Sequence, residues 1–155
     1  MDNTFLRRAI ELAKLHSTTG DKGPFGAVVV LNNTIIGEGW NQVVASKDPS
    51  AHAEVVAIRN ACKNINSHDL KNAEIYTSCE PCPMCLAAIY WARIETVYYA
   101  CSRYDAADIG FDDKQIYDEF VLSDDQKKIK LIQGLFEEGL DVFRVWRSNP
   151  QKVMY

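Results

Sequence analysis

The sequence has little of what marks several large classes of protein, beginning with positive charge. Its 17 Lys and Arg residues stand against 21 Asp and Glu, which gives a formal net charge of −4 at pH 7. Proteins that hold nucleic acid mainly through phosphate contacts usually carry a basic face or tail. The one basic cluster, Lys127, Lys128 and Lys130, lies beside acidic Asp124 and Asp125 and is interpreted as a solvated turn. We therefore expect no nucleic-acid partner.

Long apolar runs and dense cysteines are also missing. No stretch approaches the roughly 20 apolar residues of a membrane-spanning helix, and residues 1–4 lack the basic-then-apolar pattern of a secretion signal. The cysteines number five, which is odd and too sparse for a disulfide scaffold. We expect a cytoplasmic protein that contacts no membrane, and we interpret Cys62, Cys79 and Cys101 as packing residues.

The length and the hydrophobic pattern predict one α/β domain over residues 1–155. Helical spacing of apolar residues indicates helices from Phe5 to Leu15 and from Leu135 to Trp146. Short apolar runs bounded by turn residues indicate strands. The predicted strands are 26–31, 34–40, 74–77, 96–100 and 127–132. Strands that alternate with helices after an initial hairpin predict a three-layer α/β/α sandwich with a mixed, about five-stranded sheet.

A Cys-x-x-Cys pair provides the clearest chemical signal. Cys82 and Cys85 flank Pro83, and proline is favoured at the first position of a helix, where its missing N–H has no intrahelical partner. Both sulfurs then lie at a helix start, where free N–H groups and the positive end of the helix dipole favour thiolate over thiol. Thiolates are metal ligands, so the pair is a candidate metal clamp.

A catalytic zinc site needs a third protein ligand, and His52 at another predicted helix start can supply it. Such sites leave the fourth position to a water, whose pKa the metal lowers toward neutrality. Glu54, two residues further on, is free to relay that water's proton as a general acid and base. Taken singly, each element has other interpretations. A Cys-x-x-Cys pair also occurs in redox dithiols and structural zinc sites, and a lone histidine at a helix end is common.

Two further residues are candidates for substrate binding. Asn41 follows a predicted strand, and its amide can donate and accept hydrogen bonds as recognition of a base edge requires. A turn-capping asparagine is the alternative. Phe25 can form one wall of a base pocket, although a core phenylalanine is the more common case.

The motifs His52-Ala53-Glu54 and Pro81-Cys82-Pro83-Met84-Cys85 match the H-x-E and P-C-x-x-C signature of zinc deaminases. The chain resembles the cytidine deaminase-like superfamily and, within it, most closely the small bacterial guanine deaminases. The resemblance covers nearly the whole chain. It rests on residues 23–30, 48–55, 77–93, 105–107 and 110–113.

The later residues distinguish this resemblance from that to tRNA adenosine deaminases. Those enzymes typically carry a Lys-Thr-Gly-Ala run after the cysteines, which this chain lacks. It has Asp105-Ala106-Ala107 and Gly110-Phe111-Asp112-Asp113, as guanine deaminases do. The acidic net charge favours the same interpretation.

The resemblance implies a role for each matching residue. His52, Cys82 and Cys85 would bind Zn²⁺, with Glu54 as the proton shuttle. Asp113 would be a second proton carrier near the departing amine, although neighbouring Asp112 is an alternative. The residues implied in substrate binding are Asn41, Phe25, Trp91, Ala53 and Tyr155.

The resemblance also implies a homodimer in which the C-terminal segment, about 135–155, is exchanged between subunits. Trp146-Arg147 and the final Tyr155 match the family's ending, where the last tyrosine closes the partner's active site. The expected reaction is zinc-dependent conversion of guanine to xanthine and ammonia, by hydroxide attack at C2. Alternatives are deamination of guanosine, of cytosine or of adenosine in tRNA, a thiol oxidoreductase, and a non-catalytic zinc-binding scaffold.

Overall fold

The computed structural model describes residues 3–154, and its four strands follow the order of the first four predicted strands. The helices are α1 (Asn3–His16), α2 (Val43–Ser46), α3 (Ala53–Ile65), α4 (Pro83–Trp91), α5 (Arg103–Asp108), α6 (Lys114–Phe120) and α7 (Phe136–Ser148), with a 3-10 turn η1 (Ser17–Thr19). The strands are β1 (Gly26–Leu31), β2 (Thr34–Trp40), β3 (Glu74–Cys79) and β4 (Thr96–Cys101). Asn32 and Asn33 both have positive φ at the predicted hairpin turn between β1 and β2.

The sheet is mixed, with the order β2-β1-β3-β4. β1 is antiparallel to both β2 and β3, whereas β3 and β4 are parallel. The predicted fifth strand, Lys127–Ile132, is wrong for the described chain, where this segment forms turns and coil. Its alternating pattern suits a strand, but Ile129, Leu131 and Ile132 are exposed, and a strand needs a neighbour for its backbone hydrogen bonds.

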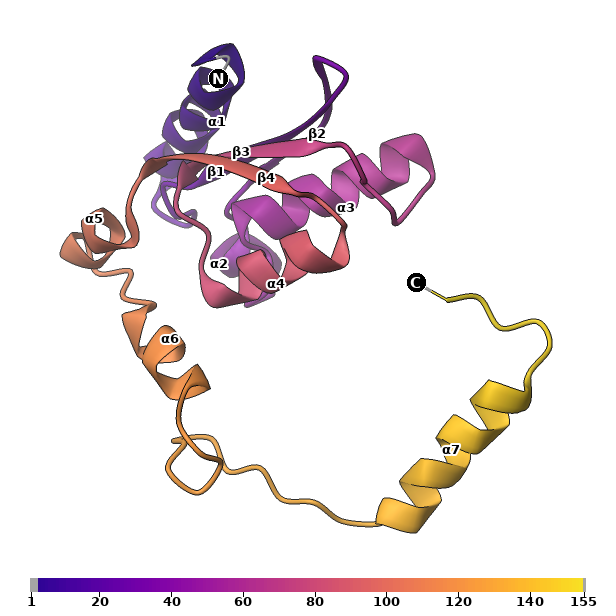
Figure 1. Cartoon of the computed structure of the whole chain (residues 1–155). Coiled ribbons are helices and arrows are strands. Elements are labelled where there is room, and N and C mark those ends of the chain that lie inside the picture. The colour runs from indigo at the N-terminus through magenta and orange to yellow at the C-terminus, as the bar shows by residue number, and fades with distance from the viewer. Residues whose placement is uncertain (1–2, 155) are drawn as a thin grey trace. The chain divides into compact units, whose positions relative to one another are not determined.

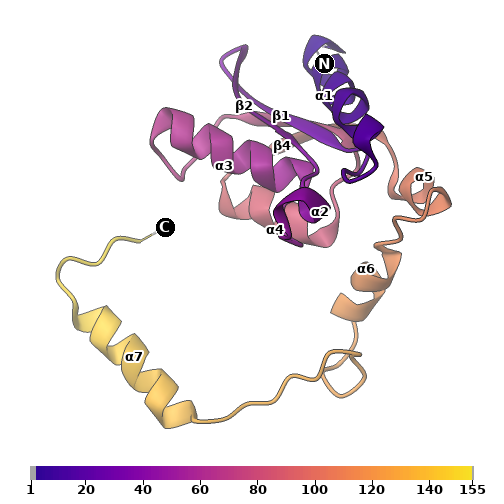
Figure 2. The same cartoon turned by 180° about the vertical axis from the view of Figure 1, so that it is seen from behind.

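Helices cover both faces of the sheet, as predicted for a three-layer sandwich. Figures 1 and 2 show α1 on one face and α3 with α4 on the other. Leu12 of α1 packs with Val28, Val30 and Tyr76. On the opposite face a larger apolar cluster joins Val29 and Ile75 of the sheet to buried residues of α3 and α4. The alternation of side chains along β1 supplies both cores, since successive residues point to opposite faces.

By its internal contacts the chain divides into two compact units, Met1–Ile116 and Tyr117–Tyr155. The first contains the sheet and both apolar clusters. Between residues 117 and 154 no residue is buried, although α7 is amphipathic. The single domain with an exchanged end therefore stays a prediction. Among residues 3–154, no helix combines the length and the apolar character needed to cross a membrane.

The strand directions gather chain segments at one edge of the sheet. Since β2, β3 and β4 run the same way, their C-terminal ends meet at the edge where antiparallel β1 begins. Phe25 precedes β1 there, Asn41 follows β2, and the loops after β3 and β4 lead to Cys82 and Arg103. Ligands in α/β sheets bind beyond such strand ends.

Candidate active site

α3 carries His52 and Glu54 at its N-terminus, and a glycine sets its position. His52 is the N-cap residue, in an extended conformation, and Glu54 lies in the first turn. A Cβ added to Gly39 of β2 would lie 2.2 Å from the carbonyl oxygen of Ala53. Because only a hydrogen occupies that space, the start of α3 can rest directly on the sheet.

α4 begins in the same way, with Cys82 as N-cap and Pro83 in its first turn, as the sequence predicts. His52 Nδ1 and Cys82 Sγ lie 3.5 Å apart, and the ligand atoms of His52, Cys82 and Cys85 all lie within 4.8 Å of one another. Zinc bonds of about 2.0–2.1 Å to nitrogen and about 2.3 Å to sulfur fit ligand atoms at such separations. Two sulfurs and one imidazole suit Zn²⁺, so these residues fit the metal.

In the protein without metal, a hydrogen bond between the two sulfurs moves their pKa values in opposite directions. A hydrogen bond from Cys85 lowers the pKa of Cys82 to about 4, and the bond to His52 acts in the same direction. The pKa of Cys85 is raised because its thiol donates to Cys82 and is buried. The pKa of His52 is raised, chiefly by its hydrogen bond to Cys82. One thiolate is therefore already present before a metal binds.

Glu54 lies beside the two cysteines, and its pKa is raised. It is buried, and Cys85 Sγ is a 3.5 Å donor to its Oε2. Burial raises the pKa of Glu54 to about 7, and the charge on Cys82 adds to the effect. A carboxyl group with such a pKa can both accept and release a proton near neutral pH, as a shuttle must.

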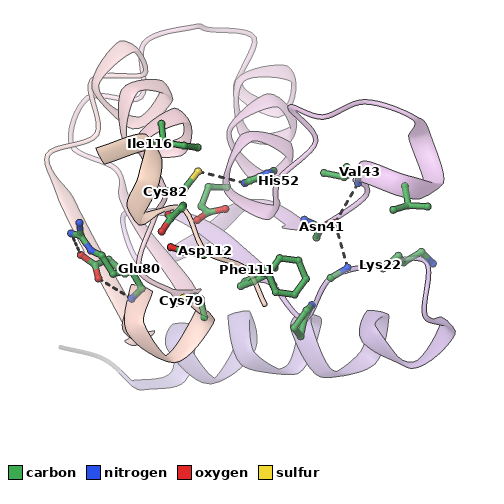
Figure 3. A pocket seen from close by; sticks show the side chains of 18 of the residues that line it. Lys22, Asn41, Val43, His52, Cys79, Glu80, Cys82, Phe111, Asp112 and Ile116 are labelled. Atoms are coloured by element: carbon green, nitrogen blue, oxygen red, sulfur yellow. Dashed lines mark hydrogen bonds and ion pairs between the residues drawn. The ribbon is translucent and has the colours of Figure 1, made fainter. Parts of the chain in front are cut away.

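These residues open onto a cavity of about 450 Å³ in the first unit, drawn in Figure 3. Predicted residues Phe25, Asn41, His52, Glu54, Cys82, Asp112 and Asp113 line it. Phe25 meets Phe111 edge to face, with ring centroids 4.9 Å apart, so the two rings form one apolar wall.

Asn41 uses its carbonyl oxygen on the backbone. Asn41 Oδ1 accepts from the N–H groups of Gly23 and Val43, each at 3.3 Å. This oxygen therefore fixes the cavity rim, and the amide NH₂ remains to donate. Both sequence interpretations of Asn41, a structural cap and a ligand-binding side chain, find support in this geometry.

The two acidic candidates differ in their contacts. Asp112 Oδ1 accepts from the N–H of Lys114 at the start of α6, 3.0 Å away. The pKa of Asp113 is raised by burial and by the charge on Cys82, while Arg103 opposes the shift. Asp113 thus lies in the field of the metal-ligand cluster, which favours it over Asp112 as the second proton carrier.

Two predicted substrate residues, Trp91 and Ala53, do not line the cavity. Trp91 is 64% exposed at the far end of α4, about 13 Å along the helix from its start at a rise of about 1.5 Å per residue. Ala53 is buried in the core because it faces the sheet. Tyr155 lies outside the described residues. Of the three cysteines interpreted as packing residues, Cys79 is buried and also lines the cavity, half-buried Cys62 packs against a core cluster, and Cys101 is exposed.

Several lining residues escaped the sequence analysis. They are the loop Gly20–Pro24, Val43, Val44, Glu80, Arg103, Ala106, Phe111 and Ile116. Glu80 and Phe111 stand inside the motifs Cys-Glu-Pro-Cys and Gly-Phe-Asp-Asp, which was the available signal. In the loop, Gly23 and Pro24 belong to the family motif at 23–30, whereas nothing in the sequence of residues 20–22 indicated a place at the cavity.

Comparison with known proteins supports a zinc site formed by these residues. Residues 1–101 match the family model described as the cytidine and deoxycytidylate deaminase zinc-binding region. A guanine deaminase of Bacillus subtilis is 49% identical over 98% of this chain and 97% of its own. The X-ray structure of guanine deaminase from Bacillus subtilis superposes with a TM-score of 0.96, at 48% identity, covering 100% of this chain and 99% of that one.

A tRNA-specific adenosine deaminase of Haemophilus influenzae is more distant, at 43% identity over 70% of this chain and 63% of its own. The match to the family model spans more than half of the chain and includes every predicted metal ligand. With its ligand triad and the buried Glu54 assembled beside one cavity, the chain belongs to the cytidine and deoxycytidylate deaminase zinc-binding family.

Proposed function

We propose that this protein hydrolyses guanine to xanthine and ammonia. The similarity to a guanine deaminase extends over both chains almost completely, whereas that to the tRNA deaminase stops at about two thirds. The observation that carries the proposal is the convergence of His52, Cys82, Cys85 and an unligated, buried Glu54 on one cavity. A purely structural zinc site would gain nothing from burying that carboxyl group, since burial of an acid costs free energy.

The chemistry divides among a few residues. Zinc held by His52, Cys82 and Cys85 would lower the pKa of a bound water and supply a nucleophile near neutral pH. Glu54 would take the proton of the attacking water and deliver it to a ring nitrogen of the base. Asp113 would carry a proton for the departing amine. Asn41 would donate hydrogen bonds to the base. Phe25 and Phe111 would stack on the face of the base or pack against its edge.

The charge of the cavity favours a neutral base over a phosphorylated substrate. Its carboxyl groups are Asp21, Glu54, Glu80, Asp112 and Asp113, whereas Lys22 and Arg103 are its lining cations. Arg103 is already paired with Glu80. A phosphate would therefore meet an excess of negative charge, which agrees with the net charge of −4 for the whole chain.

The test is ammonia release by zinc-loaded protein from guanine, guanosine, cytosine, adenine and GMP. The panel includes the nucleoside because 450 Å³ falls within the range of roughly 300–1,000 Å³ that ligand pockets occupy. We expect guanine to react fastest and GMP not at all. Glu54→Gln should retain zinc and lose nearly all turnover. Faster turnover of any other substrate would reassign the enzyme within its family.

A thiol oxidoreductase would show a different property. It requires a titratable dithiol at Cys82 and Cys85, whereas zinc would mask both sulfurs from a thiol reagent. Thiol titration before and after chelation separates the two functions. In the zinc enzyme the number of reactive thiols should rise by two on metal removal.

The second unit supports the proposal of a dimer with exchanged C-terminal segments. Large apolar side chains are exposed along it, including Phe136, Val142, Phe143 and Trp146 of α7. A unit with no buried residue cannot hold its own fold, so this apolar face needs a partner. In the described sheet β4 is an edge strand with Tyr99 and Cys101 exposed, so a second copy can dock against it.

A complementation experiment tests the exchange. Tyr155→Ala removes the side chain proposed to close a neighbouring site, and Glu54→Gln inactivates a site while leaving its C-terminal segment intact. If segments are exchanged, a mixed dimer of the two inactive chains contains one complete site and regains activity. If each segment serves its own chain, the mixture stays as inactive as its components.

A further inference from the structure

A multidentate ion pair at the cavity has no role in the mechanism so far. Glu80 stands between the end of β3 and the metal ligand Cys82, and its own N–H donates to the carbonyl of Cys101 at 2.8 Å. Glu80 Oε2 accepts from the backbone N–H of Arg103 at 3.0 Å, and Oε1 pairs with the Arg103 guanidinium. The side chains are only 18% and 30% exposed. Such charge-assisted, multidentate contacts fix orientation as well as distance.

Arg103 begins a segment that behaves as one piece, residues 103–113, called here the acidic wall. Ser102 and Asp105 form a capping box at the start of α5. After α5 the chain turns at Gly110, whose φ is +92°, and the N–H of Phe111 returns to the carbonyl of Ala106 at 3.0 Å. These local bonds order the wall from Arg103 to Phe111, and Asp113 follows two residues later.

Several contacts connect the acidic wall, and Ser102 just before it, to the rest of its unit. They include the Glu80–Arg103 pair, the Phe25–Phe111 ring contact and the 3.5 Å approach of Cys79 Sγ to the carbonyl of Ser102. Of these three contacts, the ion pair is the one that joins the wall to the loop carrying Cys82. The carboxyl group of Asp113 also lies within the electrostatic range of both Arg103 and Cys82.

We propose that the Glu80–Arg103 pair is a positioning device that sets Asp113 against the metal-binding loop and so governs the departure of the amine. The inference rests on the proposed function and assigns to Arg103 a positioning role, with no contact to substrate required. An arginine suits it, because its planar fork holds a carboxylate in a set geometry that a lysine ammonium cannot reproduce.

The experiment compares Arg103→Lys with a matched control. Arg8 forms a similar bidentate pair with Glu38, at 2.8 and 2.9 Å, between α1 and β2, and neither residue lines the cavity. Arg8→Lys should lower the thermal midpoint and leave kcat unchanged. Arg103→Lys should lower kcat by about tenfold to a hundredfold, the effect of a misplacement near 1 Å. Its KM for guanine and its zinc content of one per chain should stay at the wild-type values.

A double-mutant cycle with Asp113 separates positioning from general damage. If Arg103 acts through Asp113, then Arg103→Lys should cause no further loss of kcat in an Asp113→Asn background. Glu80→Gln, which keeps an oxygen for the Arg103 N–H, should show the same dependence if Arg103→Lys proves too unstable to purify.

The outcomes are distinct. A wild-type protein without guanine turnover removes the proposed function and this inference with it. An active wild type in which Arg103→Lys behaves like Arg8→Lys, or in which the losses from Arg103 and Asp113 multiply, overturns the inference alone. Loss of zinc from Arg103→Lys would assign the pair to metal retention instead and would equally overturn it.

Discussion

Glu54→Gln should stabilise the metal-free protein at neutral and alkaline pH while removing its activity. The pKa of Glu54 is raised by burial from 4.5 to about 7. Below pH 4.5 the group is protonated in both the folded and the unfolded chain, so it adds no penalty. As pH rises from 4.5 towards 7 the unfolded chain releases the proton and the folded chain keeps it, so stability falls. Above about pH 7 the loss is complete.

The size of this loss follows from the separation of the two pKa values. The pKa of Glu54 differs by about 2.5 between the folded and the unfolded chain, and a difference of one in pKa corresponds to about 1.4 kcal/mol. Ionisation of Glu54 therefore lowers the free energy of unfolding by about 3 kcal/mol above pH 7. Glutamine has a similar shape and no ionisable group, so the variant avoids this penalty. Relative to its value at pH 4.5, the stability difference between variant and wild type should grow by about 3 kcal/mol at pH 8.

The assay is urea denaturation of chelator-treated wild type and Glu54→Gln at pH 4.5, 5.5, 6.5 and 8. Equal m-values in the two proteins would show that only stability changes. A stability difference that stays constant over this range would mean that Glu54 titrates at its ordinary pKa in the folded protein, and one that shrinks as pH rises would mean a lowered pKa; either result would refute the reasoning.

Three further changes test separate parts of the site. Gly39→Ala should destabilise the fold by about 1–3 kcal/mol and lower zinc occupancy, since its methyl group would meet the Ala53 carbonyl; urea denaturation and metal analysis measure both effects. Asn41→Asp keeps an oxygen for the cavity rim and loses the NH₂ donor, so kcat/KM for guanine should fall by about tenfold to a hundredfold with zinc retained. Cys82→Ser should remove stoichiometric zinc, whereas Cys101→Ser should leave it unchanged; metal analysis of both variants decides.

The sequence predicted the metal half of the site because its signals are local. Pro83 marks a helix start, and the spacing of Cys82 and Cys85 puts both at that start. That His52 meets them was an inference from chemistry, and the structure brings the three ligands together. All four observed strands were predicted, because each is a short apolar run between turn residues.

The cavity walls could not be predicted in the same way, because they depend on strand order. Glu80 and Arg103 are 23 residues apart and meet because β3 and β4 are parallel neighbours. The erroneous fifth strand at 127–132 shows the opposite failure, since a suitable local pattern forms no strand without a neighbour. Trp91, assigned to the pocket by resemblance, stands at the exposed end of its helix, and its role stays a prediction.

The boundary of the family match divides the metal site from one wall of the cavity. The family model ends at residue 101, the last residue of β4, and so includes the ligands of the metal and Glu54. The acidic wall begins at Arg103, just beyond that boundary, and contributes Asp112, Asp113 and Phe111 to the cavity. Since the wall follows an edge strand, it can change between relatives without disturbing the strands that hold the metal ligands. We therefore expect this wall of the cavity to differ more between relatives than the metal ligands do.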